Sequence, residues 1–518
     1  MDEEYEDITC CHRITIFHPV IRNMLITKPV VQFFGFDRVT WANLFDITTY
    51  LGIIIMAWAV LYFLFDKTMI PNNDGFGLYF LAIFSYCLGN FFSIIPYVKL
   101  PPMLGMLLAG LIVRNSGLYN IREELGISTT SKMRTFCITI IMIRFGLQLS
   151  FTSITKNTMF IIILAIIPSS IEILIITAYC RFILLFHWEW SFMTGAILSG
   201  ISPVVIMSTL LALIEQGYGE AKRLDTILCT AACIEAVHVI SLFVICFSIV
   251  FANDEYKTQW WLYISIGIRD LILGLSIGIF LGICFIFFPH RSHRYVDRYR
   301  VTCLVLGSLM CTTGIAKIAI SGAGFLSTLT LAFISITGWK ILSHKFDSAN
   351  LRRIIHTLWK LAQPILVGII GADIDLTLWT ISRFGLHLFC ILFGLMGRCI
   401  TAYIVAWSIS SFTWKERLFL ITASIPKGTL QAALGPLAYE QLRHNEGNEE
   451  FEMALNIIML SIITFFLAPI GYSLMNYTGP IFLEQITEEQ RQKERELSYL
   501  RILSLLPESP NNQINNQE

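Results

Sequence analysis

Four charged side chains lie inside stretches of sequence that are otherwise apolar. Glu172 lies in IPSSIEILIITAY, Glu235 in CTAACIEAVHVISLFVICF, Arg398 in FGLMGRCITAY and Lys427 in SIPKGTLQ. A charged group deep in a bilayer costs about 3 kcal/mol or more, so it is retained where it is paired, solvated or used. Two acids and two bases therefore predict interior pairing around a polar pathway.

Each of these charges also has a purely structural interpretation. Glu172 and Arg398 could form a buried pair that only holds helices together. Lys427 could neutralise the carbonyl end of a broken helix without exchanging protons. Glu235 could be a neutral carboxylic acid bonded to a backbone carbonyl. The sequence leaves both interpretations open.

His238 follows Glu235 by three residues and lies on the same face of a helix. It could relay protons, or it could be a hydrogen-bonding side chain with no further role. Glu235 and His238 supply too few ligands for a metal, so no metal site is predicted. No stretch combines a nucleophile with a base or carries a nucleotide-binding motif, so we expect neither an enzyme nor a cofactor.

Two apolar stretches contain helix-breaking residues near their centres. Ser202-Pro203 interrupts the first, and Pro426–Thr429 (PKGT) interrupts the second. Proline removes a backbone donor and glycine weakens a helix. Such residues can be simple kinks. Two breaks in corresponding halves, each beside charged stretches, instead predict an ion or substrate site at the midplane of an inverted-repeat transporter.

The amino-acid composition indicates what kind of secondary-structure elements position these residues. The chain has 518 residues, of which 55% are hydrophobic and 14% charged, and its mean hydropathy is +0.66. Soluble domains carry about 25% charged residues, so we expect an all-α polytopic membrane protein surrounded by lipid. The formal net charge is zero, which argues against a nucleic-acid partner.

The apolar stretches predict about 14 transmembrane helices, at roughly 20 residues each. Their starts lie near 45, 78, 101, 132, 158, 190, 224, 260, 300, 323, 354, 383, 416 and 453. Basic residues concentrate in alternate connections, which places both termini in the cytoplasm. These connections hold Lys156, Lys222, Arg223, Arg291, Arg294, Arg298, Arg300, Lys340, Lys345, Arg352, Arg353, Lys415 and Arg417.

The predicted organisation is a tail over 1–44, a transmembrane domain over 45–480 and a second tail over 481–518. Cys10 and Cys11 lie in the first tail, either unmodified or acylated. Whether the protein lies in the plasma membrane, an endomembrane or a mitochondrial membrane is left open.

Several longer blocks follow the order of known motifs. The chain resembles the NHA-type (9B) sodium/hydrogen exchangers of the monovalent cation:proton antiporter superfamily over about 95–480. The resemblance is carried by Leu100–Gly110 (LPPMLGMLLAG), Ile143–Leu147 (IRFGL), Gln216–Gly219 (QGYG), Gln363–Asp373 (QPILVGIIGAD) and Ile425–Ala438 (IPKGTLQAALGPLA).

The resemblance implies an inverted-repeat, NhaA/NapA-like fold with two broken crossover helices. It also implies a homodimer in which core helices at about 158–251 and 383–477 move like an elevator against a scaffold. Glu172 and Arg398 fall on the family's core salt bridge, and Lys427 falls on the lysine of the second crossover.

The ion-binding motif departs from the family. Its members have two consecutive aspartates in a segment resembling AASSMDDILAI, whereas Ala231–His238 reads AACIEAVH. The first acid is the longer Glu235, whose extra methylene moves the carboxylate by roughly 1.5 Å. The second, usually the cation-coordinating carboxylate, is Ala236.

Three functions follow as hypotheses. The first is exchange of protons for a monovalent cation (Na⁺, Li⁺ or K⁺) bound near Glu235. The second is proton-coupled transport of chloride or another anion, favoured by Arg398 and Lys427. The third is a non-transporting partner that regulates an active exchanger.

Overall fold

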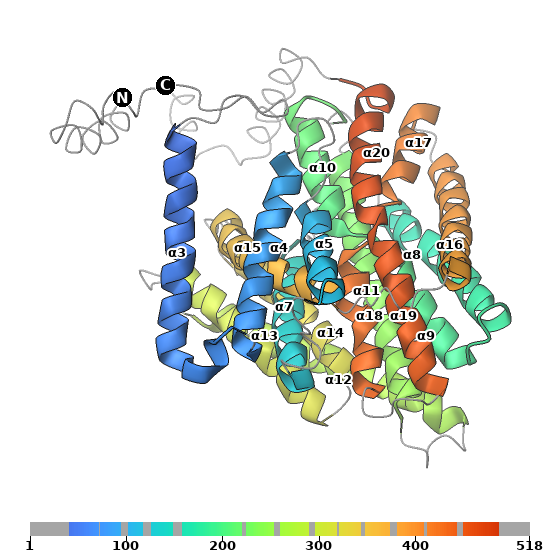
Figure 1. The fold of residues 1–518 in the computed structure, drawn as a ribbon. Coiled ribbons are helices and arrows are strands. Elements are labelled where there is room, and N and C mark those ends of the chain that lie inside the picture. The colour runs from blue at the N-terminus through green and yellow to red at the C-terminus, as the bar shows by residue number, and fades with distance from the viewer. Residues whose placement is uncertain are drawn as a thin grey trace, which may run out of the picture. The chain divides into compact units, whose positions relative to one another are not determined.

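The computed structural model describes residues 41–71, 73–94, 102–117, 126–148, 158–219, 224–252, 260–289, 296–318, 321–342, 348–372, 381–408, 412–442 and 449–485. These segments are helices and their connections (Figure 1). Among them, Tyr218 and Gln485 form an isolated antiparallel bridge pair. The predicted all-α fold is therefore confirmed. Cys10, Cys11 and the segment after 485 lie outside the described residues.

Contacts divide the chain into two compact units, Met1–Tyr79 and Phe80–Glu518. The first contains α3 (Trp41–Phe65), the short η1 (Asp66–Met69) and the start of α4 (Asp74–Ile94). Within it, the Tyr79 hydroxyl donates to the Ile54 carbonyl at 2.5 Å. The second unit holds all four charged residues that the sequence singles out.

The remaining helices follow one another along the second unit. They are α5 (Pro102–Asn115), α7 (Gly126–Gln148), α8 (Thr158–Phe182), α9 (Trp188–Ser199), α10 (Pro203–Glu215), α11 (Leu224–Val250), α12 (Trp260–Phe287), α13 (Val296–Ile318), α14 (Ser321–Leu342), α15 (Ser348–Ala372), α16 (Ile381–Trp407), α17 (Trp414–Ala423), α18 (Thr429–Leu442), α19 (Glu449–Phe465) and α20 (Leu467–Phe482).

In the described residues, ten helical spans are long and apolar enough to cross a membrane. The predicted spans near 101, 132, 300 and 416 do not meet both conditions. α5 has only 14 residues, and α17 and α18 are each shorter than a bilayer-spanning helix. α7 and α13 carry charged side chains such as Arg144 and Arg300. The total of about 14 stays a prediction.

Both predicted helix breaks are present, and they touch. α9 ends at Ser199 and α10 begins at Pro203, which occupies the first helical position, where its missing N–H costs no hydrogen bond. α17 ends at Ala423 and α18 begins at Thr429. The backbone N–H of Ser202 donates to the Pro426 carbonyl at 2.9 Å, so the two breaks meet directly.

The helices around the breaks form one packed group. α8 packs against α9, α11 and α16, while α18 packs against α9 and α19. A second group consists of α5, α7 and α12–α15, in which α14 contacts α7, α12 and α13 and α15 contacts α5 and α7. The groups join mainly where α11 contacts α12 and α14. We call the first group, α8–α11 with α16–α20, the site bundle.

Candidate functional site

The four charged side chains come from four different places in the site bundle and meet in its interior. Glu172 lies on α8, Glu235 on α11, Arg398 on α16 and Lys427 in the break between α17 and α18. Each is at most 1% exposed. The structure therefore brings together every intramembrane charge that the sequence singles out.

The four residues form one continuous chain of ion pairs. Lys427 Nζ bonds Glu172 Oε1, and Glu172 Oε2 accepts from Arg398 Nη1 at 2.9 Å. Arg398 Nη2 then donates to both carboxylate oxygens of Glu235, at 2.6 and 2.5 Å. The order is Lys427, Glu172, Arg398, Glu235. We call these four residues the charge chain.

The predicted pairing is thus only part of the arrangement. Glu172 and Arg398 do pair, as predicted, but Arg398 also binds Glu235, which was expected to form a separate ion site. With all four groups ionised, the two carboxylates and two cations sum to zero. Each buried charge then has an opposite neighbour, which the low-dielectric interior requires.

Two glycines explain how Arg398 reaches Glu172. Gly394 and Gly397 lie on the α16 face that meets α8. A Cβ at Gly397 would lie 2.1 Å from Ile175 Cδ1, and one at Gly394 would lie 2.7 Å from Ile176 Cγ1. The end of the Ile175 side chain can rotate away, whereas Ile176 is buried and has little room to shift. Gly394, and to a smaller extent Gly397, therefore favours the close packing of α8 and α16 that sets the pair.

The first break supplies backbone groups to the charge chain. The Ser199 carbonyl accepts from Arg398 Nη1 at 2.7 Å, and the Leu198 carbonyl accepts from Lys427 Nζ at 2.9 Å. The Ile201 N–H donates to Glu235 Oε1 at 3.2 Å. Carbonyls freed at the end of α9 thus meet cations, as the partial negative charge of a helix C-terminus favours.

Gln431 also belongs to this arrangement, although neither charge nor a helix-breaking residue type marks it in the sequence. It is fully buried, and its amide nitrogen lies 2.9, 3.2 and 2.8 Å from the carbonyl oxygens of Ile197, Leu198 and Gly200. Its Oε1 accepts from the Gly428 N–H at 2.8 Å. One amide therefore satisfies polar groups of both breaks. Its position inside the PKGTLQ motif was the available signal.

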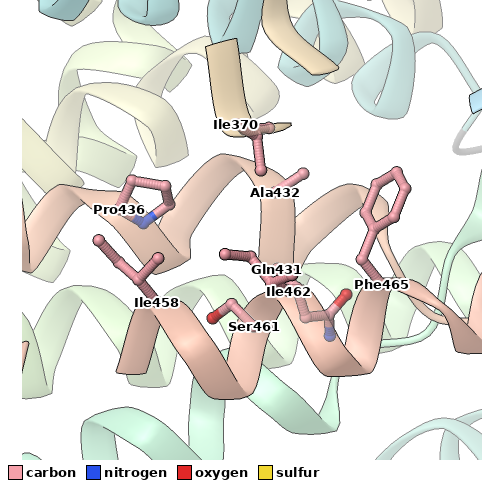
Figure 2. Close-up of a pocket in the computed structure, with 8 residues that line it drawn as sticks. All are labelled: Ile370, Gln431, Ala432, Pro436, Ile458, Ser461, Ile462 and Phe465. Carbon is pink, nitrogen blue, oxygen red and sulfur yellow. The ribbon is translucent and has the colours of Figure 1, made fainter. Parts of the chain in front are cut away.

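A cavity of about 10 Å³ lies behind Gln431, between α18, α19 and Ile370 of α15 (Figure 2). Ser461 of α19 also lines it, and within the described chain its buried hydroxyl has no hydrogen-bond partner. This volume is near the minimum for a single water molecule. The cavity is therefore too small to be a transport pathway.

Ser202, Pro203, Pro426 and Thr429 all lie where the breaks meet, and all are buried. The Thr429 hydroxyl donates to Ser202 Oγ at 3.1 Å. Two hydroxyl oxygens and the Pro426 carbonyl therefore lie close to the charge chain. These are neutral oxygen donors of the kind that hard cations bind.

The other two residues of the acidic motif lie outside the charge chain. Ala236 is 1% exposed and belongs to the buried apolar cluster that also contains Leu198 and Val239. His238 is half-buried, and its Nε2 lies 3.2 Å from Ser170 Oγ of α8. The structure therefore gives His238 a hydroxyl partner. Among the described residues, no group of three or more metal-ligating side chains could hold a metal ion.

Apolar helices that surround two touching helix breaks and a buried set of charges are typical of secondary transporters. Residues 79–472 match the family described as "Sodium/hydrogen exchanger, transmembrane", and the chain belongs to this family.

Known relatives agree with this membership. The chain is 29% identical to human sodium/hydrogen exchanger 9B1, over 83% of this chain and 82% of that protein. It is 27% identical to human sodium/hydrogen exchanger 9B2, over 86% of this chain and 82% of that protein. The resemblance to the 9B exchangers is thus confirmed.

A solved structure shows the same fold. The sodium proton antiporter MjNhaP1 from Methanocaldococcus jannaschii matches with a TM-score of 0.61 at 15% identity. The match covers 79% of this chain and 99% of the antiporter chain. The match shows that the chain has the fold of this antiporter. Membership of the exchanger family and the ten apolar spans among the described helices make it an integral, multi-pass membrane protein.

Proposed function

We propose that this protein is a secondary active transporter that exchanges protons for a monovalent cation, Na⁺, Li⁺ or K⁺. Glu235 is the carboxylate that binds either the proton or the cation. Membership of the exchanger family supports the class of activity. The assignment of this role to Glu235 rests on its position: it is a buried acid that accepts a hydrogen bond from the backbone of the first break.

Arg398 controls this carboxylate in the proposed mechanism. A small hard cation needs oxygen ligands and a compensating negative charge in a buried site. In the charge chain, Arg398 Nη2 holds both oxygens of Glu235. The cation and the guanidinium therefore compete for the same carboxylate. Arg398 can release Glu235 and keep its bonds from Nη1 to Glu172 and to the Ser199 carbonyl.

The remaining ligands come from the breaks. Ser202 and Thr429 offer hydroxyl oxygens and Pro426 offers a carbonyl where the breaks meet. Ser202 directly follows Ile201, whose N–H binds the carboxylate. These oxygens do not replace the second carboxylate that Ala236 lacks. We therefore propose one negative charge per bound cation and a weaker cation site than two carboxylates would give.

The proposed movement is that of an elevator. The site bundle carries Glu235 across the membrane against α5, α7 and α12–α15, within a homodimer with both termini in the cytoplasm. Two clefts support this division: one separates α10 from α7 and α15, and the other separates α20 from α5. The clefts leave the packing of α11 on α12 and α14 as the main surface along which the two groups would slide.

Flux into proteoliposomes tests the proposal. Purified protein is reconstituted, and a pH gradient drives uptake of Na⁺, Li⁺ or K⁺. The Glu235→Gln variant should abolish uptake because an amide neither exchanges a proton nor neutralises a cation. Glu215→Gln, an exposed acid at the end of α10, is the matched control and should retain uptake. Equal flux in wild type and Glu235→Gln would exclude exchange through this carboxylate.

A second function, proton-coupled anion transport, is favoured by the charge balance. The charge chain sums to zero, so a proton on Glu235 leaves one uncompensated positive charge beside Arg398. An anion would then enter together with the proton. Radioactive chloride uptake that depends on pH and ignores Na⁺ would identify this function.

The third hypothesis is a non-transporting partner of an active exchanger. It predicts that neither cations nor chloride move, and that Ala236→Asp, alone or with Glu235→Asp, restores cation flux. Proteoliposomes that contain these variants separate it from both transport functions.

A further inference from the structure

A second polar region lies in the cleft between α10 and the pair α7 and α15. The cleft contains a cavity of about 560 Å³. Four basic side chains line it: Arg144 of α7, and Arg352, Arg353 and His356 of α15. We call it the basic cavity. None of the charge-chain residues lines it.

The charge of the basic cavity is one-sided. Three guanidinium groups and an imidazole converge on it, and no carboxylate is among the described residues that line it. Such a cavity repels cations and attracts a phosphate group, which arginine binds through paired N–H donors.

The opposite wall of the basic cavity is apolar. α10 contributes Val204, Met207 and Leu211, together with Ser208, whose hydroxyl donates to the Val205 carbonyl of its own helix. Leu211 is 53% exposed. A small inorganic anion cannot bury this apolar surface, whereas an acyl chain would remove it from water. The pairing of a cationic side with an apolar side therefore fits an amphiphile with an anionic head group.

The location agrees with this chemistry. The distribution of Lys and Arg places the start of α15 at the cytoplasmic face, where anionic lipids concentrate. Basic pockets between transmembrane helices at that face are suited to acidic lipid head groups. We propose that the basic cavity binds the phosphate head group of an acidic phospholipid, with an acyl chain along α10.

The bound lipid would bridge two helix groups. Val204 follows Pro203, the first residue of α10 after the break, while Arg352 and Arg353 belong to the opposing group. A lipid held on both sides would resist their relative movement. This consequence rests on the proposed elevator exchange; the binding of the lipid does not.

Binding is measured first, on the full-length protein in nanodiscs. Native mass spectrometry compares discs of phosphatidylcholine alone with discs that contain phosphatidylserine or phosphatidylinositol 4-phosphate. Wild type should retain the acidic lipid. Arg352→Gln with Arg353→Gln should weaken retention by roughly 30-fold, from about 1 kcal/mol per basic residue. Arg298→Gln with Lys415→Gln removes the same charge from exposed positions and should not.

A second variant separates a lipid from a free anion. Leu211→Gln keeps every charge and disturbs only an exposed apolar side chain, so it should weaken lipid retention while the melting temperature in phosphatidylcholine stays unchanged. Inorganic phosphate at millimolar concentration should not displace the lipid. Displacement by phosphate, or no effect of Leu211→Gln, would assign the cavity to a free anion and overturn the proposal. Equal retention by the two double variants would also overturn it.

Transport is the separate readout. Acidic lipid should change the cation flux of wild type and leave that of the Arg352→Gln, Arg353→Gln variant unchanged. Absence of any flux would contradict the proposed function, whereas lipid retention would still stand.

Discussion

The two helix breaks do different work at the same site. The break between α9 and α10 contributes backbone groups: the carbonyls of Leu198 and Ser199 and the N–H of Ile201. The break between α17 and α18 contributes the side chain of Lys427, and Gln431 follows it on α18. The first break exposes polar backbone. The second break and the start of α18 satisfy the Leu198 and Gly200 carbonyls, whereas Arg398 and Glu235 on unbroken helices satisfy the Ser199 carbonyl and the Ile201 N–H.

This division means that the breaks differ in how they respond to substitution. Backbone groups survive most side-chain changes, whereas a buried cation or amide cannot be removed without leaving its partners unsatisfied. The site should therefore be sensitive at the second break and on the unbroken helices, and tolerant at the first.

Arg398→Gln should have the largest effect. It leaves Glu235 with only the Ile201 N–H and gives the charge chain a net negative charge. Removal of one partner of a buried pair costs about 3–5 kcal/mol. The free energy of unfolding, or the melting temperature in detergent, measures the loss. The double variant Arg398→Gln, Glu235→Gln restores neutrality and should recover part of it; equal instability of the two would contradict the charge balance.

Lys427→Met should cost less, about 2–3 kcal/mol, because Glu172 keeps Arg398 as a partner. The Leu198 carbonyl retains a donor in Gln431 at 3.2 Å. Lys415 is an exposed lysine on α17, so Lys415→Met is the control. The difference between the melting temperatures of Lys427→Met and Lys415→Met measures the cost. A loss of unfolding free energy as large as that of Arg398→Gln would contradict this order and show that Lys427 stabilises the charge chain as much as Arg398 does.

Gln431→Leu should cost about 2 kcal/mol, since it leaves buried backbone groups without their partner. The Gly200 carbonyl loses its donor and the Gly428 N–H loses its acceptor. Gln441→Leu, on the exposed side of the same helix, is the control. Identical melting temperatures for the two variants would contradict the role of Gln431 in joining the breaks.

Pro203→Ala should have the smallest effect, below about 1 kcal/mol, because the first N–H of a helix has no partner within the helix. Gly428→Ala is the matched change at the second break and should cost about 1–3 kcal/mol. Its φ is +154°, and an added Cβ would lie 3.2 Å from Ala468 Cβ. A larger loss of unfolding free energy for Pro203→Ala than for Gly428→Ala would contradict the expectation that the first break tolerates substitution better than the second.

The sequence predicts the parts of this site better than their connections. Buried charges and Pro-Gly interruptions are local signals, and they lead directly to Glu172, Arg398, Lys427 and the touching breaks. The bond between Arg398 and Glu235 joins residues 163 positions apart. Its formation depends on which faces of α11 and α16 meet.

The sequence does not indicate which faces of α11 and α16 meet, for a physical reason. α11 is apolar nearly all round, so the pattern of its residues does not indicate which side meets α16. The same limit explains His238, whose partner Ser170 lies on α8. Gln431 is neutral and polar, so no buried charge marks it. Its place in the PKGTLQ motif is a local signal, but that signal does not indicate which carbonyls the amide binds.

The charge chain has no net charge, and this determines how the membrane voltage acts on the site bundle. A potential of 100 mV acts on each elementary charge with about 2.3 kcal/mol, and on a neutral group with none. A site bundle that moves with its charge chain intact is therefore indifferent to voltage. One that moves with either a proton or a monovalent cation on Glu235 carries a single positive charge and is driven by the voltage. Voltage therefore acts on both loaded directions of the cycle, and in a one-for-one exchange the two contributions cancel.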